Sequence, residues 1–204
     1  MKSIIVSLML VLGADIAAAS VNNVNKILIS TTGSAYLQVS EVVAISGGID
    51  VATLANGAIA EDDGTGSYIY QNQTAPPNNA INGIGPESWP NIYHSDTAGN
   101  QEYLLITLNG SYTLNTLSIF GRSDCCSVRD VYDVQLLDTN DNVLFFASEQ
   151  SAYNSDNKAV VDLPVDASTG EGVNVPFVPL PFLLILSAVL VFIGSKSYIN
   201  NTNG

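Results

Sequence analysis

The stretch between residues 20 and 164 predicts an all-β domain built as a β-sandwich. Apolar and polar residues alternate over 132–136, which is the period of a half-buried strand. Groups of Asn, Asp, Ser, Thr and Gly separate the apolar runs, as turns between short strands do. No segment between 20 and 172 holds the 3.6-residue period of an amphipathic helix. Several short strands with turns between them favour a sandwich.

Six segments are expected to form the strands. In chain order they are 35–45, 103–108, 112–120, 132–136, 143–146 and 159–163. Asn109-Gly110 predicts a turn between the second and the third, and the polar run 138–142 predicts a turn between the fourth and the fifth. The stretch is long enough for one domain with its own hydrophobic core and too short for two.

The N-terminus has the pattern of a secretory signal peptide over residues 1–19. Lys2 is followed by a short apolar run from Ile4 to Gly13 and by the small residues Ala17-Ala18-Ala19. The apolar run is too short for a permanent membrane helix. We therefore expect cleavage after Ala19 and export of the mature chain, where a disulfide is chemically reasonable.

The C-terminus predicts a linker over 165–175 and a membrane-directed segment over 176–199. Residues 181–193 read as an apolar helix with Pro181 in its first turn, and the flanking residues supply the rest of a membrane span. Lys196 beyond the helix favours a cytoplasmic C-terminus. The arrangement resembles PEP-CTERM and related bacterial sorting tails, which exosortase-type proteases remove, although Lys196 stands where those tails carry an arginine cluster. A plain C-terminal anchor and a lipid-anchor signal stay open. The expected location is the cell surface, or the medium after tail processing.

The charge of the chain narrows the classes of partner. The formal net charge is −13, with 19 acidic residues against six Lys and Arg. So acidic a surface argues against nucleic acid and against anionic lipid headgroups as partners.

The scarcest residues of the chain are gathered in the segment Arg122–Arg129. It holds both arginines of the chain and both of its cysteines, Cys125 and Cys126, and the only histidine, His94, lies 28 residues before it. Export allows a disulfide between these cysteines, for which no other intramolecular partner exists. Two reduced, buried thiols are the alternative.

These residue types suit a polar, uncharged ligand such as a sugar. Arg122 and Arg129 donate hydrogen bonds in fixed planar forks and keep their charge, and a ring nitrogen of His94 would add a third donor. Asp124 is expected to orient both arginines. A bridged pair of adjacent cysteines would be a rigid apolar plate for the C–H face of a sugar. The other interpretations are an ion-pair cluster that pins a loop, and a solvated histidine in a polar loop.

The order of the segments resembles a discoidin-type, galactose-binding-like domain, and in particular the F-type, fucose-binding lectins. The resemblance spans about 35–163 and is most specific in Arg-x-Asp-Cys-Cys-x-x-Arg with an upstream histidine. The segments that carry it are Tyr36–Val42, Ala80–Gly83, His94, Glu102–Leu108, Arg122–Arg129 and Val134–Asp138. The spacing from His94 to Arg122 is one residue longer than in the commonest family motif.

The resemblance implies a jelly-roll fold with binding loops at one end. It implies that Arg122 and Arg129 bind the axial hydroxyl and ring oxygen of L-fucose, that His94 binds a neighbouring hydroxyl, and that the bridged Cys125-Cys126 packs against the sugar. A structural calcium is also possible, near a position that is Asn82 here. The acidic run 61–66 lacks the alternation of ligands in an EF-hand and is expected to be a turn. Tyr68, Tyr70, Trp89 and Tyr93 are candidates to cover the methyl group of the sugar.

Two classes of function follow from these residues, and a third is disfavoured. The first is an exported, fucolectin-like carbohydrate-binding module. The second is a structural or adhesive surface protein, for instance of a biofilm matrix, without fucose specificity. An enzyme is not expected, because the sequence has no carboxylate pair, no Ser/His/Asp order and no cluster of metal ligands.

Overall fold

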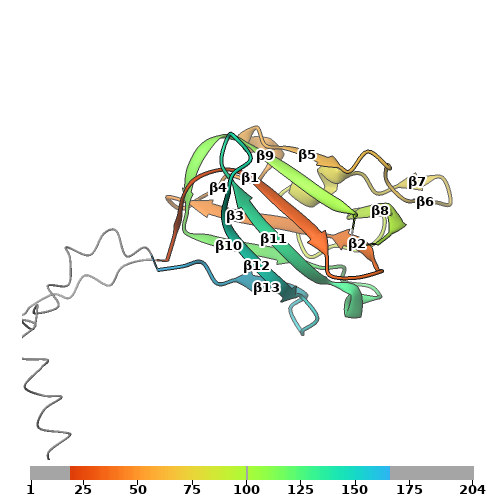
Figure 1. Ribbon diagram of the computed structural model, residues 1–204. Helices are drawn as coiled ribbons and strands as arrows, with labels where there is room; N and C mark the ends of the chain where they lie inside the picture. Colours follow the sequence, from red (N-terminus) through yellow and green to blue (C-terminus); the bar gives the residue numbers. More distant parts are fainter. Residues whose placement is uncertain (1–18, 100, 166–204) are drawn as a thin grey trace, which may run out of the picture. The chain divides into compact units, whose positions relative to one another are not determined.

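The computed structural model describes residues 19–99 and 101–165, and this part of the chain is all-β (Figure 1). Its helices are short 3-10 turns, and every other regular element is a strand. The prediction of an all-β domain is confirmed. The 3-10 turns are η1 (Leu54–Asn56), η2 (Pro77–Ile81) and η3 (Ser127–Arg129).

The larger sheet has five antiparallel strands in the order β12-β11-β1-β9-β5. Its central strand places Ile29 opposite Val134 of β11 and Leu104 of β9. This central strand is absent from the sequence prediction, because asparagines and a lysine interrupt its apolar positions. The strands are β1 (Val21–Thr31), β5 (Ile59–Asp62), β9 (Tyr103–Leu114), β11 (Val131–Leu137) and β12 (Val143–Ser151).

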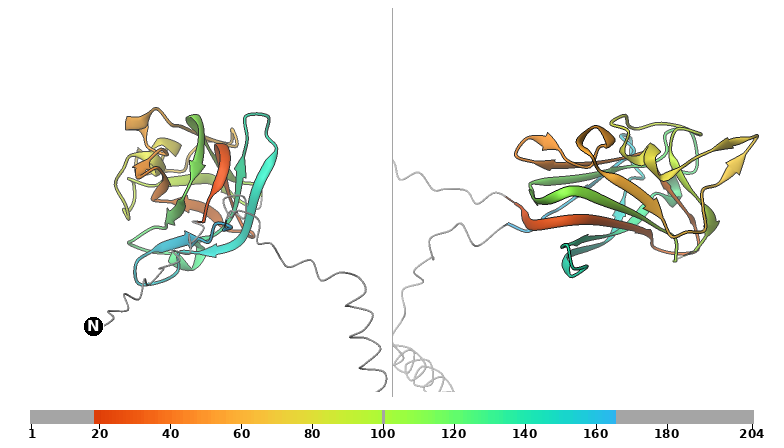
Figure 2. Two further views of the ribbon diagram at one scale, coloured as in Figure 1. Left: turned by 90° about the vertical axis from the view of Figure 1, so that its left-hand side faces the viewer. Right: turned by 90° about the horizontal axis from the view of Figure 1, so that it is seen from above.

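The smaller sheet has four antiparallel strands in the order β13-β10-β3-β4, and two short strand pairs complete the fold. In one pair β2 lies against β8, and in the other β6 and β7 form a hairpin that projects from the body of the domain (Figure 2). The strands are β2 (Tyr36–Val39), β3 (Glu41–Ser46), β4 (Ile49–Asp50), β6 (Ile69–Tyr70), β7 (Gln73–Thr74), β8 (Tyr93–Ala98), β10 (Thr116–Phe120) and β13 (Lys158–Val161).

Both sheets contribute to one hydrophobic core. Ile27 and Ile106 of the larger sheet and Val42 and Leu117 of the smaller one are fully buried in the same cluster. Complete burial of such a side chain stabilises the fold by about 2 kcal/mol relative to leaving it in water. The core therefore fixes the frame from which the loops at the strand ends extend.

Two details of the predicted strands are wrong. The segment 35–45 is two strands that break at Ser40 and belong to different sheets, β2 with β8 and β3 with β10. Asn109-Gly110 is not a turn, because β9 continues through it to Leu114. The extra residues form an irregularity in the β1–β9 ladder, where the side-chain amide of Asn25 donates to the Gly110 carbonyl at 2.9 Å. The predicted turn over 138–142 is confirmed between β11 and β12.

The first and last described residues meet at one edge of the domain. Ala19 pairs with Val165, and the Ser20 amide donates to the Pro164 carbonyl at 2.9 Å. The expected signal peptide, most of the expected linker and the expected C-terminal segment lie outside the described residues. Among the residues that are described, no helix is long and apolar enough to cross a membrane.

Candidate functional site

A buried carboxylate anchors the loop after β10. Asp130 is fully buried, and its Oδ2 accepts the backbone amide of Arg122 at 3.0 Å. Gly121 makes this approach possible, since a Cβ there would lie 2.3 Å from Asp130 Oδ2. The loop then closes through η3, where the Arg129 amide donates to the Cys126 carbonyl at 3.0 Å. The two arginines are thereby fixed at opposite ends of one short loop.

Arg122 and Asp124 form a bidentate ion pair. Arg122 Nε lies 2.5 Å from Asp124 Oδ1, and its Nη2 lies 2.8 Å from Oδ2. The hydrogen bond lowers the pKa of Asp124 and raises that of Arg122, and the backbone amide of Trp89 also stabilises the Asp124 carboxylate. Arg129 is exposed, and its side chain makes no hydrogen bond or ion pair with the described residues. Asp124 therefore orients Arg122 and not Arg129, contrary to the expectation for both.

Cys125 and Cys126 are bonded to each other in a disulfide, with their Cα atoms 3.8 Å apart. Cys126 adopts a left-handed conformation with φ of 65°. Cys125 is exposed and Cys126 is half-buried, so the bridged pair lies at the surface of the loop that carries the two arginines. The interpretation as reduced, buried thiols does not fit this geometry.

His94 lies in strand β8 and not on a loop, and it is only 5% exposed. Its ring stacks on Tyr68 with centroids 4.7 Å apart, and it also contacts Tyr36 at 5.1 Å and the edge of Trp89 at 6.0 Å. The interpretation as a solvated histidine is therefore wrong. Tyr36 could not be assigned to this site from the sequence, because its place beside His94 depends on the pairing of β2 with β8.

The hydrogen bond of His94 determines which of its ring nitrogens carries the proton. Nδ1 lies 2.7 Å from the Ser95 carbonyl, which can only accept, so Nδ1 carries the proton. Burial lowers the pKa of His94 below 6.5, and the charges of Arg122 and Arg129 lower it further. In this tautomer the neutral ring offers Nε2 as an acceptor rather than as the expected donor.

Backbone hydrogen bonds connect the elements that surround this site. The Ser123 amide donates to the Glu87 carbonyl at 2.9 Å, which ties the arginine loop to the loop that carries Trp89. The Tyr68 amide donates to the His94 carbonyl at 2.9 Å, so the base of the β6–β7 hairpin lies along β8. Tyr70 of this hairpin contacts Trp89 edge-on at 6.4 Å. Of the candidate aromatic residues, Tyr93 alone is fully buried in the core.

Unsatisfied polar atoms are concentrated around the same site. Buried polar groups nearly always have a hydrogen-bond partner, so each exception needs an explanation. In the described residues, the buried side-chain atoms without a partner belong to Gln38, Glu41, Trp89 and Asp130. Gln38 lies opposite His94 in the β2–β8 pair, Trp89 contacts the His94 ring, and Asp130 holds Arg122.

Two of these groups are buried carboxylates with strongly shifted pKa values. Burial raises the pKa of Asp130 to about 7 and that of Glu41 to about 7. Glu41 Oε2 accepts the amides of Gly83 and Ile84 at 3.1 and 3.3 Å, whereas its Oε1 has no partner. The hydroxyl of Tyr132 donates its one proton to the Gln38 carbonyl at 2.7 Å, which leaves Asp130 Oδ1 without a donor.

The expected calcium position at Asn82 is occupied by local hydrogen bonds. Asn82 Oδ1 accepts the Ile84 amide at 2.7 Å, and its Nδ2 donates to Glu87 Oε2 at 3.0 Å. Among the described residues, no group of three or more His, Cys, Asp or Glu is placed to hold a metal ion. Structural calcium stays a prediction, and nothing in the site requires it.

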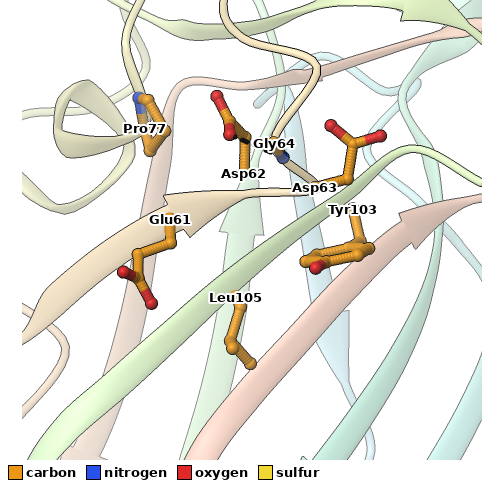
Figure 3. A pocket seen from close by; sticks show the side chains of 7 residues that line it. All are labelled: Glu61, Asp62, Asp63, Gly64, Pro77, Tyr103 and Leu105. Atoms are coloured by element: carbon orange, nitrogen blue, oxygen red, sulfur yellow. Dashed lines mark hydrogen bonds between the residues drawn. The ribbon is translucent and has the colours of Figure 1, made fainter.

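A recess away from the arginine loop lies between β5, β9 and the start of η2 (Figure 3). Its wall is acidic, and its carboxylates lie at the end of β5 and in the turn that follows. Asp62 Oδ1 accepts the Gly64 amide at 2.9 Å, and Asp63 Oδ1 accepts the Thr65 amide at 3.0 Å. The residues that line it are Glu61, Asp62, Asp63, Gly64, Pro77, Tyr103 and Leu105.

In comparisons with known proteins, no family model, no curated protein and no solved structure matches this chain.

Proposed function

We propose that this chain is an exported, non-catalytic carbohydrate-binding protein whose β-domain, a galactose-binding-like jelly roll, binds fucose or a closely related sugar. The observation that carries the proposal is a disulfide at the surface, in a short loop between two arginines. The Ser123 amide ties this loop to the segment of Trp89, whose ring contacts the buried His94.

Each of these groups has a function in binding a sugar ring. Asp124 orients Arg122, and the guanidinium donors that this ion pair does not use are left for a ligand. The side chain of Arg129 has no hydrogen-bond or ion-pair partner in the described fold and can give its guanidinium donors to ligand oxygens. His94 Nε2 accepts from a hydroxyl, and the disulfide supplies an apolar surface for C–H groups.

The charge of the site favours a neutral ligand. Asp124 compensates Arg122, so the loop has one uncompensated positive charge inside a strongly acidic protein. Sugar hydroxyls and a ring oxygen satisfy guanidinium donors without needing a full negative charge. A single sugar in such an open site should bind with a dissociation constant on the order of tens to hundreds of micromolar, or roughly −5 to −6 kcal/mol.

The ends of the chain support display of this domain at the cell surface. The signal-like pattern of residues 1–19 directs export, and the apolar segment 176–199 directs the chain to a membrane or to a sorting protease. The partners are then glycans outside the cell and, through the tail, a membrane.

A glycan array probed with the purified full-length chain tests the proposal. The expected result is binding to fucose-terminated glycans, competed by free methyl α-L-fucoside, with no binding to the same glycans after fucosidase treatment. Binding that ignores fucosidase, or no binding to any glycan, would contradict it and would favour the adhesive alternative.

A further inference from the structure

Gln38 lies on the same face of the β2–β8 pair as His94. The two residues are directly opposite each other in the antiparallel register, so their side chains point to the same side. Tyr36, two residues before Gln38, shares that face, and its ring contacts His94 at 5.1 Å. The flanking residues Leu37 and Val39 point the other way, into the hydrophobic core.

The side chain of Gln38 is buried and has no hydrogen-bond partner within the described fold. It is 1% exposed, and both its Oε1 and its Nε2 lack a partner. Its backbone is satisfied differently, since the Gln38 carbonyl accepts the hydroxyl of Tyr132 at 2.7 Å. An amide buried in this way destabilises the fold, because it has lost water and gained nothing. A leucine or methionine would fill the same space without that cost.

The position of the amide indicates what would satisfy it. It lies beside the His94 ring, whose Nε2 accepts a hydrogen bond, and η3 with Arg129 packs against its strand. The carboxamide of Gln38 therefore adds one hydrogen-bond donor group and one acceptor oxygen beside the acceptor nitrogen of His94. Two neighbouring hydroxyls of a sugar ring match this set, since one can donate to His94 while the other exchanges hydrogen bonds with the amide.

We infer that Gln38 is a further ligand-binding residue of this site. Its carboxamide binds a hydroxyl adjacent to the one bound by His94, in direct contact or across one ordered water. This inference rests on the proposed function and adds that the ligand presents vicinal hydroxyls to the β2–β8 pair.

Gln38→Met separates a binding role from a structural one, because methionine keeps the volume and removes both polar atoms. In the absence of sugar, the variant should melt at the same temperature as the parent or about 2 to 4 °C higher. In calorimetric titration with methyl α-L-fucoside, its affinity should fall at least about fivefold. Leu37→Met on the same strand is the matched control, since it faces the core and should leave affinity unchanged.

Monodeoxy fucosides sharpen the assignment. One analogue, which lacks the hydroxyl bound by Gln38, should bind the parent and the Gln38→Met variant equally, while the other analogues keep the difference. A variant that melts lower than the parent and binds fucoside equally well would show that the amide serves the fold, and the inference would be overturned. Unchanged melting with unchanged affinity, or a loss that is equal for every analogue, would overturn it too. If the parent itself does not bind fucoside, the proposed function is rejected, and the role of Gln38 that rests on it is rejected too.

Discussion

Charged residues are concentrated in two segments of this chain, the acidic turn and the arginine loop. The two segments differ in whether their polar groups find hydrogen-bond partners within the fold. In the acidic turn, Asp62 and Asp63 accept amides from residues just two positions later, so local backbone satisfies them. In the arginine loop, the side chain of Arg129 has no hydrogen-bond or ion-pair partner in the described fold, and buried groups near the loop keep atoms without a partner. Both segments stand out in the sequence, but only the second is left with hydrogen-bonding capacity for a ligand.

This difference shows that a turn is distinguished from a binding site by whether its polar groups have hydrogen-bond partners, more than by how many charges it carries. A carboxylate that caps its own turn contributes to the local fold and has little left for a partner. A buried polar atom without a partner costs stability, and the fold tolerates that cost most readily where function requires it. Each prediction below changes one side of this contrast.

The largest expected effect is on the pH dependence of stability. Asp130 and Glu41 have pKa values raised to about 7, so in the folded state they bind protons that the unfolded chain releases above pH 4 to 5. Stability should therefore fall as pH rises from about 4 toward and through 7, on the order of 3 kcal/mol for each group. Denaturant unfolding of the parent between pH 4.5 and 8 measures this.

Asp130→Asn isolates the contribution of one group, because asparagine keeps an acceptor for the Arg122 amide and cannot ionise. Its stability should decline less with pH than that of the parent. Asp162→Asn, which changes an exposed carboxylate, is the control and should follow the parent. Equal pH dependence in all three proteins would show that Asp130 is ionised in the fold throughout this range.

The next effect is on affinity for fucoside. Arg129→Ala should weaken binding by about 2 kcal/mol or more, because sugar oxygens lose charged donors, and Arg129→Lys should not restore it. Its melting temperature should be unchanged, since Arg129 is exposed and has no ion pair in the described fold. Arg122→Ala should cost similar affinity and some stability as well, because it leaves Asp124 unpaired. Parent-like titrations of both alanine variants would remove the loop from the site.

A smaller effect is expected at His94. Its pKa lies below 6.5, so the ring is neutral above that value, and fucoside binding should weaken as pH falls below it. Protonation turns Nε2 from an acceptor into a donor and adds charge beside two arginines. The contribution of His94 to stability should also fall as pH falls, because the unfolded chain takes up the proton more readily, and it opposes the larger contribution of Asp130 and Glu41.

His94→Phe keeps the ring stack with Tyr68 and removes both nitrogens. It should lose about 1 kcal/mol of binding and most of the pH dependence in this range. A variant that binds like the parent at pH 7 and still weakens at pH 5 would place the titrating group elsewhere.

The smallest effect is expected in the acidic turn. Asp62→Asn and Asp63→Asn keep an acceptor oxygen for the turn amides, so each should cost less than about 1 kcal/mol of stability. Fucoside affinity should be unchanged within calorimetric error. A marked loss of affinity in either variant would move the binding site to the recess of Figure 3.

The sequence predicts the β-class and most strands well because alternation is a local property. The strands over 103–108, 132–136, 143–146 and 159–163 all correspond to observed ones. β1 was missed because its first half is rich in asparagine, and it is stabilised by two neighbouring strands that no local pattern reveals. The break at Ser40 also depends on tertiary contacts, since Ser40 bonds to Phe120 and its hydroxyl accepts from Glu87.

The site was predictable only where its residues are rare. Arg122, Arg129 and the two cysteines stand out by composition, and His94 by being unique. Gln38 and Tyr36 are ordinary residues whose importance arises from one register of β2 against β8. The buried state of His94, which decides that it accepts rather than donates, likewise follows from packing and not from sequence.

The most direct test of the central claim is an NMR titration of the isotope-labelled chain with methyl α-L-fucoside. The account predicts that saturating sugar shifts the Nε–H resonances of Arg122 and Arg129 and the ring signals of His94. The amides of Gly64 and Thr65 in the acidic turn should stay in place. Shifts confined to the acidic turn, or no shifts at millimolar sugar, would contradict it.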